Sequence, residues 1–164
     1  MHQPLRLRCR SAALVSNFCN LRVRAGTTVG AAVKADGYGL GAAQVVRRLW
    51  DEGCRDFFVS TWWEAQQLNF LPPDSLSVLH GPGPEDECIS GVRPVLNSAS
   101  QIARWRDAHS GSPCDIMVDT GMNRLGIAPV HAGSASRQMS FRCSTASTSI
   151  PFTATWPAPM KIMS

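Results

Sequence analysis

The hydrophobic and polar positions of the chain alternate between two patterns from about residue 11 to residue 121. Short, continuously apolar runs are typical of strands buried on both faces, and apolar residues that recur every three to four positions are typical of helices. The pattern predicts strands at 27–33, 56–61, 76–81, 93–97 and 114–121, and helices at 11–22, 42–53, 63–71 and 98–109. Short strands joined by helices predict an α/β fold whose parallel sheet is covered on both faces.

Residues at the ends of these segments support the predicted boundaries. Ser11 and Ser98 stand where a helix N-cap is expected, and Gly53 stands where a helix ends. The pair Pro72-Pro73 is expected to stop the third helix, because proline cannot continue the hydrogen-bond ladder.

Two architectures fit this order of elements: an open doubly wound sheet, or part of a (β/α)8 barrel of about five βα units. A complete barrel needs roughly 250 residues, and this chain has 164. In a partial barrel the fifth strand is expected to be an exposed edge, which favours aggregation. Residues 130–164 are rich in Ser, Thr, Ala and Pro and have no sustained period, so an irregular tail is predicted there.

Composition narrows the classes of function. Apolar residues make up 44% of the chain and charged residues 17%, which suits a folded core and excludes a disordered, highly charged chain. The net charge is +4 with no block of basic and aromatic residues, so nucleic acid is not an expected partner. No segment is long and apolar enough for a membrane span. The six cysteines and four histidines lack metal-ligand spacing, so we expect no metal site and reduced thiols in a cytoplasmic protein.

The first candidate for chemistry is Lys34, at the end of the first predicted strand. Ligands of parallel α/β proteins bind at the carboxyl ends of strands. A lysine that loses part of its hydration there can act as a nucleophile or base, or form a Schiff base with an aldehyde cofactor. Tyr38 offers a hydroxyl group, and the glycines at 37, 39 and 41 allow close approach of a ligand. A lysine merely extended into solvent remains an equally simple reading.

The second candidate is the segment 117–126, MVDTGMNRLG, which follows the fifth predicted strand. It gathers Asp119, Thr120, Asn123 and Arg124 at a strand end. The arginine is suited to hold a phenolate, carboxylate or phosphate through charge-assisted hydrogen bonds. A turn with a solvated arginine is the alternative.

Together the two segments resemble the signatures of alanine racemases. The runs AAVKADGYGLGA and MVDTGMNRLGI carry the resemblance at a similar separation. LRLRCRSAALVSNFCNLR is similar to the family's opening strand and helix, with Cys9 and Arg10 where an Ile/Val-Asp pair is common. GCRDFFVSTWWEAQQL is similar to its second βα unit, so the resemblance spans about residues 5–129, as a partial N-terminal barrel domain.

The resemblance implies a pyridoxal-phosphate enzyme of fold type III. Alanine racemases interconvert L- and D-alanine as homodimers, in the cytoplasm, and supply D-alanine for peptidoglycan. Lys34 matches the lysine that carries pyridoxal 5'-phosphate and is the base specific for D-alanine. Tyr38 matches a phosphate-contacting tyrosine, and Arg124 matches the arginine near the cofactor's ring hydroxyl and the substrate carboxylate. Met117 stands where some members have a carbamylated lysine.

Other parts of the family pattern are missing from these 164 residues. The family's second base is a tyrosine of a C-terminal domain, and Tyr38 is the chain's single tyrosine. We therefore expect an N-terminal fragment that is inactive alone. A non-catalytic carrier of pyridoxal phosphate with a related small barrel, or a remnant without function, are the alternatives.

The tail has a possible explanation in its reading frame. Read one nucleotide earlier, the codons of Trp156 and Pro157 force alanine, and those of Met160 and Lys161 force glutamate. Both fit the family's next strand, which ends in a His-Leu-Ala-Cys-Ala-Asp-Glu-like run. Our hypothesis is a frameshift between about residues 129 and 139.

Overall fold

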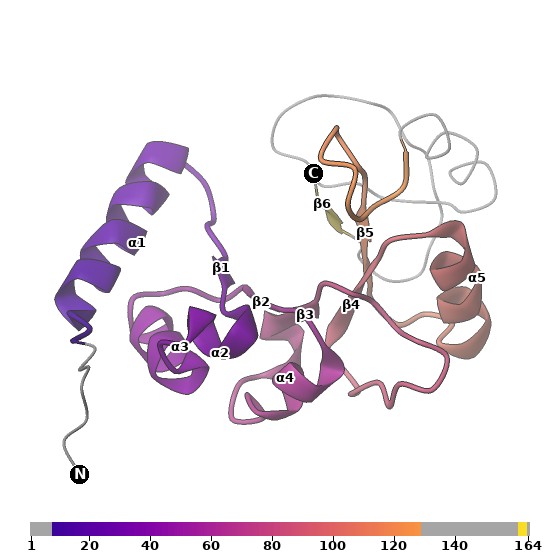
Figure 1. Ribbon diagram of the computed structural model, residues 1–164, viewed down its shortest axis with the longest axis horizontal. Helices are drawn as coiled ribbons and strands as arrows, with labels where there is room; N and C mark the ends of the chain where they lie inside the picture. Colours follow the sequence, from indigo (N-terminus) through magenta and orange to yellow (C-terminus); the bar gives the residue numbers. More distant parts are fainter. Residues whose placement is uncertain (1–7, 129–160, 164) are drawn as a thin grey trace, which may run out of the picture. The chain divides into compact units, whose positions relative to one another are not determined.

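The structure is a computed structural model that describes residues 8–128 and 161–163. It divides into two compact units, Met1–Phe58 and Val59–Ser164. In both units the strands alternate with helices, and the strand pairings are parallel (Figure 1). The α/β fold and the five consecutive strands predicted from the sequence are confirmed, although each strand is shorter than predicted.

The first unit contains three helices and a short parallel strand pair. Its elements are α1 (Ser11–Ala25), β1 (Ala31–Ala32), α2 (Lys34–Tyr38), α3 (Ala42–Asp51) and the first residues of β2 (Phe57–Val59). Ala31 of β1 pairs with Phe57 of β2. The buried apolar side chains of this unit are Phe18, Val33, Val46, Leu49, Cys54 and Phe57. Gly30 lets the strands approach, because a Cβ atom there would lie 2.6 Å from the Phe58 ring.

The ends of α1 differ from the prediction. Arg10, not Ser11, occupies the N-cap position, and its side chain makes no capping hydrogen bond. The helix continues to Ala25 and ends at Gly26, whose φ of 62° is the left-handed conformation that a C-cap glycine adopts readily. Glycine therefore sets the end of this helix, while serine does not set its start.

The second unit continues the βα alternation. Its elements are α4 (Trp62–Gln66), the 3-10 turn η1 (Pro73–Ser75), β3 (Leu76–Val78), β4 (Arg93–Leu96), α5 (Ala99–Ala108), β5 (Asp115–Met117) and β6 (Lys161–Met163). The amide of Leu79 donates to the carbonyl of Val59, the last residue of β2. Helix α5 lies beside β4 and β5 (Figure 1). A cluster of buried hydrophobic side chains forms the core here: Leu96, Ile102, Trp105, Cys114, Ile116 and Ile127. Ser98 caps α5 by accepting from the Gln101 amide, as predicted.

The helix predicted at 63–71 is confirmed only over Trp62–Gln66. After Gln66 the chain tightens into turns, in which the Leu68 amide donates to Ala65 and the Leu71 amide to Leu68. These turns bury both leucines, and Pro72, which follows directly, offers no amide to extend the helix.

The expectation that the fifth strand would be left as an edge was wrong. Residues 161–163 form β6, which pairs in parallel with β5 through partners such as Ile116 and Ile162. The rest of the predicted irregular tail, 130–160 and 164, lies outside the described residues.

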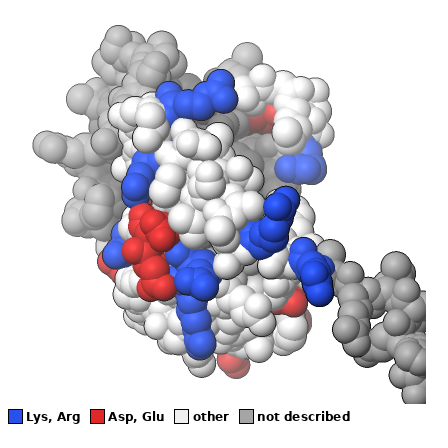
Figure 2. Space-filling view, turned by 90° about the vertical axis from the view of Figure 1, so that its left-hand side faces the viewer, with Lys and Arg blue, Asp and Glu red and all other residues white. Residues whose placement is uncertain are grey.

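The face of the molecule drawn in Figure 2 shows no single charged patch. On the face drawn in Figure 2, lysine and arginine side chains are spread singly or in small groups, with acidic side chains among them. None of the described helices has the length and hydropathy needed to cross a membrane.

Candidate functional site

Lys34 follows directly on the carboxyl end of β1. The backbone amide of Val33 donates to the carbonyl of Phe58 at 2.8 Å, which extends the contact with β2 by one residue beyond the strand. Val33 is buried, whereas Lys34 is half-buried. The structure thus places the half-buried lysine just beyond the strand end, where the sequence predicted it.

The residues after Lys34 form a left-handed turn, which the sequence analysis did not predict. The φ and ψ angles of Ala35 are 51° and 50°, those of Asp36 are 52° and 47°, and Tyr38 has a φ of 57°. Left-handed backbone costs a non-glycine residue roughly 1–2 kcal/mol. Three such residues in succession with Gly37 make this the most strained segment of the described chain, and strain of this kind gathers at functional sites.

Hydrogen bonds hold the turn against the following helix. The amide of Gly37 donates to Val33 at 2.8 Å, and that of Gly41 donates to Asp36 at 2.9 Å. The Asp36 carboxylate accepts from the amide of Ala42 at 2.7 Å, so it caps α3 from outside the helix. This role of Asp36 was not predicted from the sequence, although an acidic residue shortly before a predicted helix is a usable signal.

Tyr38 and Lys34 therefore belong to one fixed turn. The Tyr38 side chain is 63% exposed, which leaves its hydroxyl open to a ligand. A Cβ atom at Gly39 would meet nothing within 4 Å, so this side of the turn is open. An amine can form a Schiff base with an aldehyde, and a phenol can donate to a phosphate, so these two side chains fit pyridoxal phosphate.

The second part of the predicted site is the loop that follows β5, residues 119–127. Its base is closed by two backbone hydrogen bonds: the Asp119 amide donates to Ile127 at 3.0 Å, and the Ile127 amide donates to Met117 at 2.9 Å. Gly126 is required at the closure, because its φ is 106° and a Cβ atom would lie 2.8 Å from the Asp119 nitrogen. Ile127 packs in the buried cluster under α5, which fixes the far end of the loop.

The Asp119 carboxylate organises the loop from within. Its Oδ1 atom accepts from the amides of Gly121 at 2.9 Å and Asn123 at 3.0 Å. These backbone donors, of which Gly121 has the largest effect, lower the pKa of Asp119 below its ordinary value because they stabilise the charged form. Asn123 has a φ of 55°, and its side-chain amide donates to the Gly121 carbonyl.

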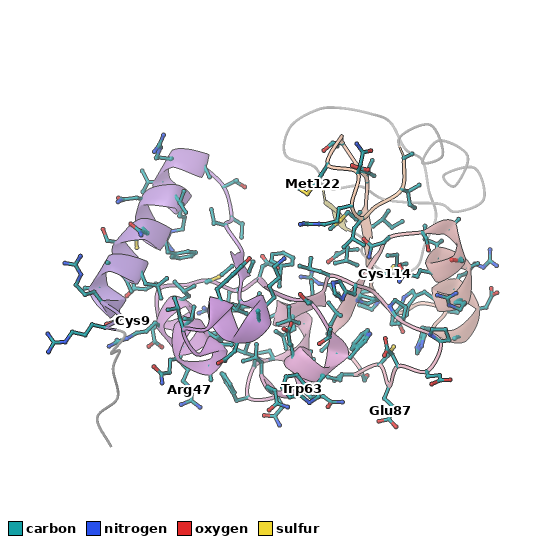
Figure 3. All side chains as sticks on the ribbon, in the orientation of Figure 1. Cys9, Arg47, Trp63, Glu87, Cys114 and Met122 are labelled. Atoms are coloured by element: carbon teal, nitrogen blue, oxygen red, sulfur yellow. The ribbon has the colours of Figure 1, made fainter. Side chains whose placement is uncertain are left out.

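Arg124 and Thr120 are exposed on this loop, and Met122, with 72% of its side chain exposed, projects from it (Figure 3). Met117 is half-buried at the end of β5. Arg124 belongs to the second unit and Lys34 to the first, so the structure describes the two parts of the predicted site separately. Among the described residues no group of three or more His, Cys, Asp and Glu side chains could hold a metal ion.

Comparison with known proteins gives consistent matches. The family model for the N-terminal domain of alanine racemase matches residues 10–147. The alanine racemase of Methylobacterium nodulans is 43% identical over 136 residues, which cover 77% of this chain and 37% of that protein. The alanine racemase of Rhodospirillum rubrum is 45% identical over 129 residues, which cover 72% of this chain and 34% of that protein. The chain thus spans about a third of the length of the curated relatives it matches.

Solved structures agree with the sequence matches. The crystal structure of alanine racemase from Bartonella henselae with covalently bound pyridoxal phosphate is similar, with a TM-score of 0.68 and 35% identity over 77% of this chain and 38% of that one. Alanine racemase from Acinetobacter baumannii has a TM-score of 0.67 at 20% identity and supports the fold alone. These matches favour part of a barrel over an open doubly wound sheet.

Proposed function

This chain belongs to the alanine racemase family and matches its N-terminal domain. On that premise we propose that it carries the part of a pyridoxal-phosphate site for alanine that contains the cofactor-binding lysine. The observation that supports the proposal most directly is the strained turn Lys34–Tyr38 at the carboxyl end of β1. The family is one of pyridoxal-phosphate-dependent isomerases, and the donors of this turn fit that cofactor.

Lys34 is proposed as both the point of cofactor attachment and a catalytic base. When bound, pyridoxal phosphate supplies an electron sink that makes the α-proton of an attached amino acid acidic. Lys34 is half-buried, which restricts its side chain and so limits the positions that its amine can take beside a ligand. On the family resemblance, this amine removes and returns the α-proton on the D-alanine side.

Tyr38 and Arg124 are proposed as binding residues. Tyr38 is exposed, and its hydroxyl would hold the cofactor phosphate by donating a hydrogen bond to it. Arg124 offers a planar, permanently charged fork to the substrate carboxylate or the ring oxygen. Each is carried by backbone that hydrogen bonds hold in place, so little ordering is needed when the ligand binds.

Racemisation requires a second base on the opposite face of the substrate. On the family resemblance this second base is a tyrosine, and Tyr38, which we propose for the phosphate, is the single tyrosine among the 164 residues. We therefore propose that these 164 residues alone bind pyridoxal phosphate without racemising alanine, and that catalysis needs the homodimer of the family. A cytoplasmic setting is part of the same proposal.

The experiment is incubation of the chain with pyridoxal phosphate, followed by borohydride reduction and peptide mass spectrometry. We expect the cofactor on Lys34 in the wild-type chain and no specific attachment in Lys34→Ala. Lys161→Ala is the control for adventitious labelling, since Lys34 and Lys161 are the two lysines of the sequence. Labelling of both lysines to the same extent would contradict the proposal. Interconversion of D- and L-alanine by the wild-type chain would contradict the proposed need for a second base.

We also infer that the tail after about residue 129 is encoded out of frame. The forced alanine and glutamate codons support this. Sequencing the coding DNA tests it: a shifted frame that is closed, or that lacks a downstream tyrosine-bearing domain, would rule it out.

A further inference from the structure

The loop that carries Arg124 is held by one carboxylate at its centre. Asp119 accepts two hydrogen bonds from amides of the same loop, at 2.9 and 3.0 Å, and its own amide closes the base of the loop. The residue thus fixes the path of the backbone on both sides of the turn that leads to Arg124.

The backbone of this loop has few other means of keeping its shape. Gly121 has a φ of 124° and meets nothing within 4 Å of a would-be Cβ atom, so no side-chain packing confines it. Asn123 sits at a φ of 55°, a left-handed conformation that costs free energy unless local hydrogen bonds compensate. The bond from the Asn123 amide to Asp119 supplies that compensation directly before Arg124.

From this geometry we propose that Asp119 is a positioning residue, which fixes the backbone of residues 121–124 and so presents Arg124 to the anionic group of a ligand. Asp119 needs no contact with the ligand for this role. The inference rests on the proposed function only in taking Arg124 as the residue that meets the ligand.

The proposal requires an acceptor at this position more than it requires a charge. Asp119→Asn keeps an oxygen that can accept from both amides, and Asp119→Ala keeps none. Asp86→Ala is the matched control: Asp86 is an exposed carboxylate of the same unit that accepts from the Gly83 amide at 2.7 Å in another loop. It removes the same charge and a similar bond without touching the Arg124 loop.

Two measurements on the full chain test the proposal. Amide hydrogen exchange by NMR reports whether Gly121 and Asn123 stay bonded. The rate of phenylglyoxal modification at Arg124, located by mass spectrometry with and without pyridoxal phosphate, reports whether the arginine meets the ligand. In Asp119→Ala we expect exchange at both amides to rise several-fold and protection of Arg124 to disappear. Asp119→Asn should retain most of the protection, and Asp86→Ala should match the wild-type chain.

The two hypotheses fail in different ways. If pyridoxal phosphate does not protect Arg124 in the wild-type chain, the proposed binding role of Arg124 fails. The exchange rates then decide the inference, and unchanged rates at Gly121 and Asn123 in Asp119→Ala overturn it. If the wild-type arginine is protected and Asp119→Ala is protected equally, the inference fails while the proposed function stands. Loss of protection in Asp86→Ala as well would assign the effect to net charge and also overturn the inference.

Discussion

The strongest effect on stability is predicted for a buried polar cluster in the second unit. Asp115 on β5 is 1% exposed, and its Oδ2 atom accepts from the Ser77 hydroxyl at 3.0 Å. The Nε atom of Arg93 on β4 lies 3.8 Å from the same oxygen. Strand alternation explains the cluster: Leu96 and Ile116 face α5, so residues one or three positions away in each strand face the opposite side of the sheet.

The size of the effect follows from burial. Removing one partner of a buried ion pair costs about 3–5 kcal/mol, because a desolvated charge loses its counter-charge. Arg93 keeps 20% of its side chain exposed, so water can partly replace the carboxylate and the lower part of that range applies. We expect Asp115→Ala to lower the free energy of unfolding by about 3 kcal/mol, and Ser77→Ala by about 1 kcal/mol.

Urea unfolding followed by tryptophan fluorescence measures these changes. The double variant Arg93→Met/Asp115→Leu removes both charges together, and we expect it to lie within about 1 kcal/mol of the wild-type chain. Asp107→Ala is the surface control, because Asp107 and Arg106 form an exposed pair that water screens. A cost of Asp115→Ala no larger than that of Asp107→Ala, or a double variant as unstable as Asp115→Ala, would refute the reasoning.

Three further predictions concern backbone strain and a buried thiol. Ala35→Gly should leave the free energy of unfolding in urea unchanged or raise it, because glycine adopts the left-handed conformation of Ala35 without strain. Ala43→Gly within α3 is the control and should lower the free energy of unfolding by about 1 kcal/mol. Equal costs for the two variants would contradict the left-handed turn. Gly126→Ala should destabilise the chain and speed amide exchange at Ile127, since its Cβ atom would lie 2.8 Å from the Asp119 nitrogen; unchanged exchange would count against this closure. Burial, with a smaller contribution from Asp115, raises the pKa of Cys114 from 9.0 to about 12. Its protonated thiol therefore adds stability below pH 9.0 that is lost as the pH rises toward about 12, and it should resist Ellman's reagent at pH 8 while the exposed Cys9 reacts.

The order of strands and helices could be predicted because periodicity records which side chains are buried. The helix predicted at 63–71 ends at Gln66, for a reason that periodicity does not reveal. Leu68 and Leu71 are buried as a helix would bury them, but turns place them there instead. An apolar spacing of three residues fits both a helix and successive tight turns, so pattern alone could not separate them.

The candidate site shows a different limit. Lys34 follows the end of β1, and Arg124 lies in the loop that follows β5, and the sequence predicted both locations from strand order alone. The left-handed conformation of Ala35 and Asp36 was not predicted, because their side chains disfavour it and only the neighbouring glycines hinted at unusual backbone. The conformational preference of these two residues is overridden by the hydrogen bond from Gly37 to Val33 and by the Asp36 cap on α3. Propensities of single residues do not include such bonds.

In both parts of the candidate site an aspartate side chain binds the backbone of its own turn, which explains why short motifs identify them. In each part an aspartate inside a glycine-containing turn accepts a backbone amide, Asp36 from Ala42 and Asp119 from Gly121 and Asn123. These bonds reach no more than six residues along the chain, so much of the shape of each turn comes from its own segment. A chain that spans about a third of its relatives can therefore retain both turns. Closure of a barrel depends on pairings between distant strands, and no motif of this length encodes them. On the proposed function, binding of pyridoxal phosphate at Lys34 should therefore be separable from racemisation of alanine, since the proposed binding residues lie on such turns and the proposed second base does not belong to these 164 residues.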